Sequence, residues 1–201
     1  SSLPKQGKTT VSVNLALAMA LAGERVVLVE CDMRRPRLHV YLGLENKVGL
    51  SSVLAGTAQL NEAIQTVRVS DFVAQSSKKN HAQSRTGKSL HVICSGPVPP
   101  NPGELTASKR MSQLLNALSS EIGYDFVIVD TAPALLVADP LVLATQVDGV
   151  LVSARLRSTK TGEAARLRGL LDKAGARVLG VVVGSNRRGR AYYGYGYGYG
   201  Y

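Results

Sequence analysis

Five short runs of apolar, mostly β-branched residues recur along the 201-residue chain, and segments with helical spacing lie between them. The runs are RVVLV, LHVIC, DFVIV, DGVLVSA and RVLGVVVG. Strands that are apolar on both faces and alternate with helices are typical of a parallel sheet covered by helices on each side. The sequence therefore predicts an α/β fold with a mainly parallel sheet, in one domain with a sizeable core.

The predicted helices occupy most of the segments between these strands. The first runs through VSVNLALAMALAG and stops at Gly23, and short helical pieces lie within residues 34–68, one of them starting at the N-cap Asn61. Further helices are predicted for the segment ELTASKRMSQLLNALSS and near residues 139–146 and 161–173. Residues 70–89 are polar and mixed, which predicts a surface loop.

Composition narrows the classes of partner and compartment. No stretch reaches 18 uncharged apolar residues, so a membrane span within this chain is excluded. The formal net charge of +10 favours a polyanionic partner: a nucleotide, a nucleic acid or anionic lipid. Cys31 and Cys94 are predicted to be buried thiols in a reducing compartment.

A phosphate-binding pattern precedes the first helix. Gly7-Lys8-Thr9 closes the pattern G-x-x-x-x-G-K-[ST], with Ser2 where the first glycine would stand. A tight loop before a helix presents backbone N–H groups and the helix dipole to phosphate. Lys8 would reach the β- and γ-phosphates, and the Thr9 hydroxyl would bind Mg²⁺.

Carboxylates follow two of the predicted strands. Glu30 and Asp32 come after RVVLV, and Asp130 comes after FVIV. Mg²⁺ is usually held by one or two carboxylates together with phosphates and water, and another carboxylate could accept a hydroxyl proton. The alternative is that these strand-end acids only cap loops.

The C-terminal segment has an unusual composition. Six of the eight tyrosines lie in the last ten residues. There, after a basic stretch, most of the tyrosines alternate with glycines. We therefore divide the chain into a domain, residues 1–186, and a basic linker with a disordered Gly/Tyr-rich tail, residues 187–201. Phosphate adds about −1.5 to −2 per site, so six sites could cancel the positive charge of the chain. Stacking or self-association of the tail is the alternative. The candidate phosphorylation sites are Tyr192, Tyr193, Tyr195, Tyr197, Tyr199 and Tyr201.

These motifs together resemble those of the bacterial tyrosine kinases, the BY-kinase family that governs capsule and exopolysaccharide production. SSLPKQGKTT resembles the Walker A segment of that family, VVLVECDMRRP its Walker A′ segment and DFVIVDTAPA its Walker B segment. SGPVPPNPGEL, DGVLVSARLRSTKTG and the tyrosine cluster are also similar to family signatures. The resemblance covers nearly the whole chain and implies a P-loop NTPase-like fold.

The resemblance also implies roles for residues. ATP would be bound by Pro4, Gly7, Lys8, Thr9 and Thr10, and Asn186 is a weaker candidate for the adenine edge. Asp32 and Asp130 would hold Mg²⁺ with Thr9, and Glu30 with Asp32 would approach the incoming tyrosine hydroxyl as base. The catalytic set is thus Lys8, Glu30, Asp32 and Asp130.

For assembly and regulation, the resemblance implies a homo-oligomeric ring in which the tails are phosphorylated in trans. A membrane activator, fused upstream or encoded separately, would place the kinase at the cytoplasmic face of the bacterial inner membrane. The kinase would there regulate polysaccharide polymerisation and export. A strand normally precedes the phosphate loop in such folds, whereas this chain starts inside the loop. We therefore expect a longer protein, with the first strand and the oligomerisation and membrane-spanning parts upstream.

Several positions depart from the family pattern. Lys5-Gln6 stands where Gly-Glu is usual, Glu30 replaces an aspartate, and Asp130-Thr131-Ala132-Pro133 keeps only the second of two prolines. The tyrosines are spaced by glycines rather than contiguous. Reduced activity is compatible with these changes, and none removes a phosphate lysine or a metal-binding acid.

Two other function classes remain open. A ParA/MinD-like positioning ATPase shares the fold but carries a lysine five residues before the phosphate lysine, where this chain has Leu3. A nucleotide-binding scaffold without transfer activity is the other alternative. Nucleic-acid binding is disfavoured because the basic residues are scattered, apart from those in residues 187–190.

Overall fold

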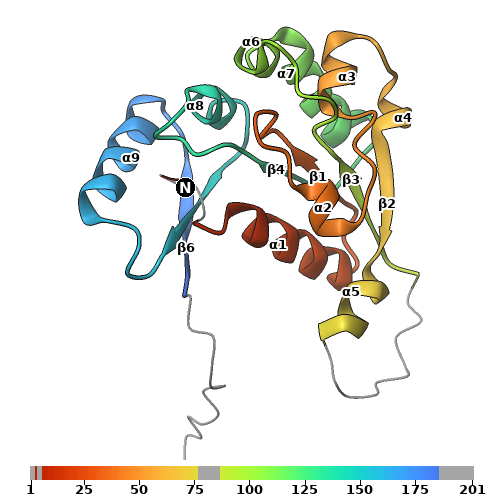
Figure 1. Ribbon diagram of the computed structural model, residues 1–201, viewed down its shortest axis with the longest axis horizontal. Helices are drawn as coiled ribbons and strands as arrows, with labels where there is room; N and C mark the ends of the chain where they lie inside the picture. The colour runs from red at the N-terminus through yellow and green to blue at the C-terminus, as the bar shows by residue number, and fades with distance from the viewer. Residues whose placement is uncertain (1–2, 4–5, 77–86, 186–201) are drawn as a thin grey trace, which may run out of the picture.

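The computed structural model describes residue 3 and residues 6–76 and 87–185. Helices and strands alternate along most of this range (Figure 1). The helices are α1 Lys8–Ala22, α2 Leu38–Leu42, α3 Leu50–Ala55, α4 Leu60–Ala63, α5 Val69–Ser76, α6 Pro102–Thr106, α7 Lys109–Asn116, the π-helical η1 Ala117–Glu121, α8 Asp139–Ala144 and α9 Thr161–Lys173. The strands are β1 Val26–Glu30, β2 Ile64–Arg68, β3 Ser89–Ile93, β4 Phe126–Asp130, β5 Val150–Arg155 and β6 Val178–Gly184.

The strands form two sheets in the described part of the chain. Four strands pair in the order β2-β3-β1-β4, and β5 pairs with β6 in a second sheet. All pairs are parallel except β2 with β3, so the predicted α/β fold with mainly parallel strands is confirmed. The single sheet that was predicted is instead two sheets in the described residues. The register places Glu30 opposite Asp130, which brings the carboxyl ends of β1 and β4 together.

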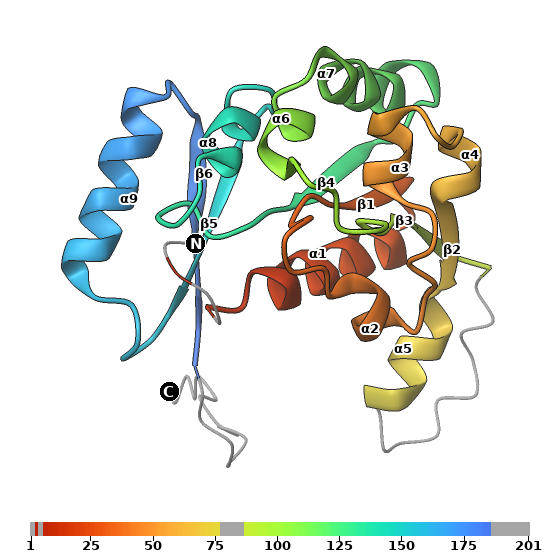
Figure 2. The ribbon, with the colours of Figure 1, turned by 45° about the horizontal axis from the view of Figure 1, so that its top comes forward.

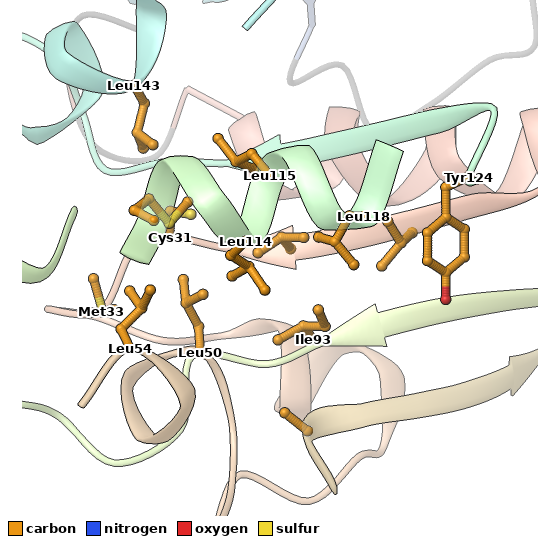
Figure 3. Packing of buried hydrophobic residues seen from close by; sticks show 14 residues of the cluster. Cys31, Met33, Leu50, Leu54, Ile93, Leu114, Leu115, Leu118, Tyr124 and Leu143 are labelled. Carbon is orange, nitrogen blue, oxygen red and sulfur yellow. The ribbon is translucent and has the colours of Figure 1, made fainter. Parts of the chain in front are cut away.

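Helices cover both faces of the four-stranded sheet (Figure 2). On one face, residues of α3 and α7 pack with β1 and β3 around Leu50, Leu114 and Ile93 (Figure 3). On the other face, α1 and α2 pack against the same strands through residues that include Val13, Ala16 and Leu38. Strand β1 is buried along its whole length, as the apolar residues 26–29 predict, and its last residue, Glu30, is buried with them.

A cavity of about 550 Å³ separates the two sheets. Its lining includes all of β4, the first four residues of β5 and residues of α1, α8 and α9. In the described range, β4 pairs only with β1 and β5 only with β6, so one edge of each strand faces this space. The strand expected before the phosphate loop stays a prediction.

Three sequence-based predictions of local structure were wrong in part. The helix expected from Asn61 is only the end of α4, because Ile64–Arg68 is a strand antiparallel to β3 with Val67 buried. The loop expected over residues 70–89 contains most of α5 and the start of β3. The single helix expected after Pro102 is interrupted, since the Ser108 hydroxyl accepts a hydrogen bond from the Met111 amide and starts α7 anew.

Two other predictions hold. Helix α1 ends at Gly23, whose left-handed backbone lets its N–H bond to the Ala20 carbonyl. Cys31 and Cys94 are buried free thiols directly after β1 and β3. In the part of the chain described, no helix has the length and apolar character needed to cross a membrane.

Candidate functional site

The phosphate loop lies at the carboxyl edge of the four-stranded sheet and leads into α1. Gly7 has φ 85°, a left-handed conformation that glycine adopts without strain, and it is the N-cap of α1. The first turn of α1 contains no acidic side chain, so its free N–H groups and Lys8 present a positive field to an anion. The Ser153 hydroxyl of β5 donates to the Gln6 carbonyl at 2.6 Å, which fixes the loop to the second sheet.

Asp130 lies at the centre of the site. It is only 2% exposed at the end of β4, and both of its carboxylate oxygens accept hydrogen bonds from α1. The Thr9 hydroxyl donates to Oδ2 at 2.7 Å and the Ser12 hydroxyl donates to Oδ1 at 3.1 Å. These two bonds connect the phosphate loop directly to the strand-end carboxylate.

Burial dominates the electrostatics of the three charged groups. Desolvation raises the pKa of Asp130 to about 6, against the opposing effect of the Thr9 and Ser12 hydrogen bonds and of Lys8. Desolvation also raises the pKa of Asp32, and the N–H of Arg35 and the charge of Lys8 oppose that shift. Burial lowers the pKa of Lys8, although Asp130 and Asp32 act in the opposite direction. Lys8 and the two aspartates therefore form one interacting set.

Asp32 lies on the loop of residues 31–37, which we call the acidic loop. Its side chain is half-buried, and Oδ1 accepts a hydrogen bond from the Arg35 amide at 3.2 Å. Further along the same loop, the Arg34 guanidinium pairs with Asp139 at the start of α8, with Nε 3.2 Å from Oδ2. The acidic loop is therefore anchored to α8 while Asp32 faces the phosphate-loop lysine.

Glu30 has a different environment from Asp32 and Asp130. It is 1% exposed, and the hydrogen bonds to its carboxylate come from the backbone amides of Arg37, Leu38 and Ser95. Its predicted role as a base stays a prediction here. The structure thus brings Lys8, Thr9, Asp32 and Asp130 together, while Glu30 points its carboxylate at backbone.

The remaining predicted ligands of the nucleotide and the phosphorylation sites divide into two groups. Thr10 is exposed on α1, and its hydroxyl lies 2.9 Å from the Tyr41 hydroxyl of α2. Pro4, Asn186 and the six tail tyrosines lie outside the described residues, so their predicted roles stay predictions.

Sequence reasoning missed three residues that contact this site: Ser12, Tyr41 and Ser153. Ser12 could have been found, because it lies three residues after Thr9 and therefore on the same face of α1. Tyr41 and Ser153 approach from α2 and β5, so only the tertiary structure brings them to the phosphate loop.

The donor atoms at the site fit Mg²⁺ held together with phosphate. Among the described residues, no group of three or more His, Cys, Asp or Glu side chains could form an all-protein metal site. Mg²⁺ usually takes one or two carboxylates and completes its shell with phosphate oxygens and water. Asp130 and Asp32, with the Thr9 hydroxyl between the loop and β4, supply such a set.

Replacing Asp130 with asparagine should stabilise the folded protein at pH 8 by about 1–3 kcal/mol. The folded chain holds the Asp130 proton up to about pH 6, whereas the unfolded chain releases it near pH 3.8. The folded state therefore binds more protons between these values, and its stability falls as pH rises towards 6. Asparagine cannot ionise, so the variant does not lose this stability as pH rises. Its stability relative to the wild type should therefore be highest at pH 8 and nearly unchanged at pH 4.

Thermal unfolding of the Asp130→Asn variant at both pH values measures this effect. The exposed Asp172, which pairs with Arg168 on α9, provides the matched control as Asp172→Asn. That control should show little change at either pH. A loss of stability at pH 8 in Asp130→Asn would contradict the assigned electrostatics.

Comparisons with known proteins agree with this geometry. Residues 6–162 match the family described as "AAA domain". The tyrosine-protein kinase YwqD of Bacillus subtilis (strain 168) is 35% identical over 198 residues, which cover 96% of this chain and 75% of that protein. The kinase domain of the Escherichia coli tyrosine kinase ETK superposes with a TM-score of 0.79 at 34% identity, covering 98% of this chain and 70% of that one.

A more distant structure shows the fold alone. The cell division ATPase MinD of Pyrococcus furiosus has a TM-score of 0.66 at 23% identity, over 91% of this chain and 69% of that one. The predicted P-loop NTPase-like fold is therefore confirmed. Together, the phosphate loop, the strand-end aspartates and the identity over nearly the whole chain show that this protein belongs to the bacterial tyrosine-protein kinases, as a P-loop catalytic domain.

Proposed function

We propose that this kinase transfers the γ-phosphoryl group of ATP to tyrosines of its own C-terminal segment, on a neighbouring copy of the chain. The observation that carries the proposal is the 2.7 Å hydrogen bond between Thr9 and Asp130, which joins the phosphate loop to a buried strand-end carboxylate beside Lys8. Six tyrosines within ten residues supply the acceptors.

The residues of the site have separate tasks in this reaction. The N–H groups at the start of α1 and the Lys8 ammonium bind the phosphates and stabilise the charge that develops during transfer. Thr9, Asp32 and Asp130 would hold Mg²⁺, which neutralises charge on the β- and γ-phosphates when bound. Pro4, Gly7 and Thr10 would complete the phosphate loop, and Asn186 would contact the adenine.

The transfer itself needs a base for the phenol. The tyrosine oxygen forms a bond to the γ-phosphorus, the bond from that phosphorus to the β–γ bridging oxygen breaks, and ADP leaves. Asp32 is the carboxylate placed to accept the phenolic proton, because it is half-buried at the site, whereas the Glu30 carboxylate is enclosed by backbone amides.

The biological setting follows from the resemblance to the family. We propose a homo-oligomeric ring in which tails reach neighbouring sites, and a membrane protein or membrane-spanning region that activates the kinase at the cytoplasmic face of the inner membrane. Phosphorylation of the tail would then favour disassembly, and so regulate exopolysaccharide or capsule polymerisation and export. No nucleic-acid partner is proposed.

Intact-mass analysis after incubation with ATP and Mg²⁺ tests the transfer. The wild type should gain a ladder of up to six phosphates, whereas a variant with the six tail tyrosines changed to phenylalanine should gain none. The matched control is Tyr124→Phe, which removes a tyrosine outside both the tail and the site and should keep the ladder.

A mixing experiment tests transfer between copies. An active chain that lacks tail tyrosines is incubated with a Lys8→Met chain that keeps them. Phosphate on the Lys8→Met chain would support transfer in trans. A wild type that binds ATP but gains no phosphate would contradict the proposal, and would instead favour a nucleotide-binding scaffold or a MinD-like ATPase, which shares this fold.

A further inference from the structure

The carboxylate of Glu30 is enclosed by backbone N–H groups from two separate segments. Oε1 accepts hydrogen bonds from the amides of Arg37 at 2.5 Å and Leu38 at 2.8 Å, and Oε2 accepts one from the amide of Ser95 at 3.1 Å. Arg37 and Leu38 form the start of α2, and Ser95 follows β3. One side chain at the end of β1 therefore joins both segments.

These contacts leave Glu30 poorly suited to proton transfer. Its side chain is 1% exposed, so an incoming tyrosine does not meet it at the surface. Both carboxylate oxygens already accept bonds from donors that would be left unsatisfied in a buried setting if the group were protonated or withdrawn. Asp32 contrasts with this, because it is half-buried, and its bonds from the Arg35 and Arg34 amides come from its own loop.

The position of Glu30 lets it hold both ends of the acidic loop. The loop leaves β1 immediately after Glu30 and returns at Arg37, whose amide bonds to the Glu30 carboxylate, so both ends of the loop are held by one residue. The Arg34–Asp139 ion pair holds the middle of the loop against α8. Asp32 lies between these two anchors.

We propose that Glu30 is a positioning residue that fixes the acidic loop, and with it Asp32, relative to Lys8 and Asp130. The carboxylates that act at the metal and on the tyrosine are then Asp32 and Asp130, and Glu30 acts through the backbone. The additional methylene of glutamate, compared with aspartate, lets the carboxylate extend from β1 to the amides of α2 and of Ser95 together. This inference rests on the proposed transfer to tyrosine only for its activity measurement.

Amide hydrogen exchange of the 201-residue chain tests the contacts without any assay of transfer. The Arg37, Leu38 and Ser95 amides should be protected in the wild type in the absence of nucleotide. Glu30→Gln and Glu30→Asp should each raise their exchange by about tenfold or more, the first because an amide replaces one acceptor oxygen, the second because the side chain is too short. The control is Ser95→Ala, which removes a hydroxyl that has no partner among the described residues and keeps the Ser95 amide.

Two further measurements separate positioning from a base role. ADP affinity without Mg²⁺, which depends on the Lys8 loop, should stay within about twofold in both Glu30 variants. In both variants the kcat for tail phosphorylation should fall by about 10²-fold, the loss expected from misplacing Asp32 by about 1 Å. Glu30→Asp keeps a carboxylate, so an equal fall in that variant is expected of positioning and not of a base.

Three outcomes would overturn the inference. The first is full amide protection in Glu30→Gln together with lost transfer, which would make Glu30 a base. The second is lost protection with unchanged transfer, which would leave Glu30 purely structural. The third is unprotected Arg37 and Leu38 amides in the wild type, a result that needs no variant to fold. If the wild type itself transfers no phosphate, exchange and ADP binding still decide whether the contacts exist, and the proposed function alone fails.

Discussion

Replacing Lys8 with methionine should reduce phosphoryl transfer by about 10³-fold or more, the largest effect we expect from a single substitution in this chain. The ammonium of Lys8 is half-buried beside two carboxylates, and its place at the start of α1 would let it reach the β- and γ-phosphates. Methionine keeps the length of the side chain and removes the charge. Tail phosphorylation followed by intact mass measures the loss.

The surface residue Lys47 provides a matched control for this experiment. Its ammonium pairs with Glu45 in an exposed position, so Lys47→Met removes the same charge away from the site and should change the rate by less than about twofold. A Lys8→Met protein that keeps more than a tenth of the wild-type rate would contradict the role assigned to the phosphate loop. Circular dichroism of both variants shows whether they remain folded.

Gly49→Ala should destabilise the protein by about 3 kcal/mol, at the upper end of the range for overpacking. A Cβ at this position would lie 2.3 Å from the Cys94 carbonyl oxygen and 2.3 Å from the Gly96 amide nitrogen. Both are backbone atoms, and neighbouring hydrogen bonds, including Leu50 N–H to the Cys94 carbonyl at 2.8 Å, hold the two segments together. The clash therefore has to be relieved by moving the loop after β3.

Thermal unfolding should show the Gly49→Ala change as a fall in Tm of about 6–12 °C. Gly180→Ala in β6 is the matched control, because nothing lies within 4 Å of its added Cβ. Gly43→Ala adds a second comparison, since its φ of 66° brings backbone strain without a clash and should cost only about 1 kcal/mol. A Gly49→Ala protein as stable as the Gly180→Ala protein would show that the backbone at residue 49 and the loop after β3 can move apart.

The main elements could be predicted from the sequence because their signals are local. Apolar runs mark β1, β3, β4, β5 and β6, and glycine after an apolar helix marks the end of α1. Strand β2 was missed because its five residues follow directly from α4, and IQTVR has only two apolar residues, too few to distinguish a strand from a continuing helix. Its antiparallel pairing with β3 is a long-range contact that decides the conformation.

The same distinction applies to the site. Lys8, Thr9, Asp32 and Asp130 could be predicted because parallel strands place their carboxyl ends at one edge, where a phosphate loop also lies. The partners of Glu30 could not be predicted, because its donors are backbone amides, one of them 65 positions away in the sequence. An Asp or Glu at a strand end in the sequence predicts a site at that edge of the sheet. Only the tertiary structure shows which of these carboxylates face the site.

The phosphate loop also links the two sheets, with a thermodynamic consequence. The Gln6 carbonyl is bonded to Ser153 of β5, and Thr9, three residues later, is bonded to Asp130 of β4, so the loop bridges the cavity between those strands. A ligand that orders the loop therefore also restrains the two sheets relative to each other. Such coupling is reciprocal. An occupant of the cavity that held β4 and β5 in the same arrangement would therefore increase nucleotide affinity by the factor by which bound nucleotide increases the affinity for that occupant.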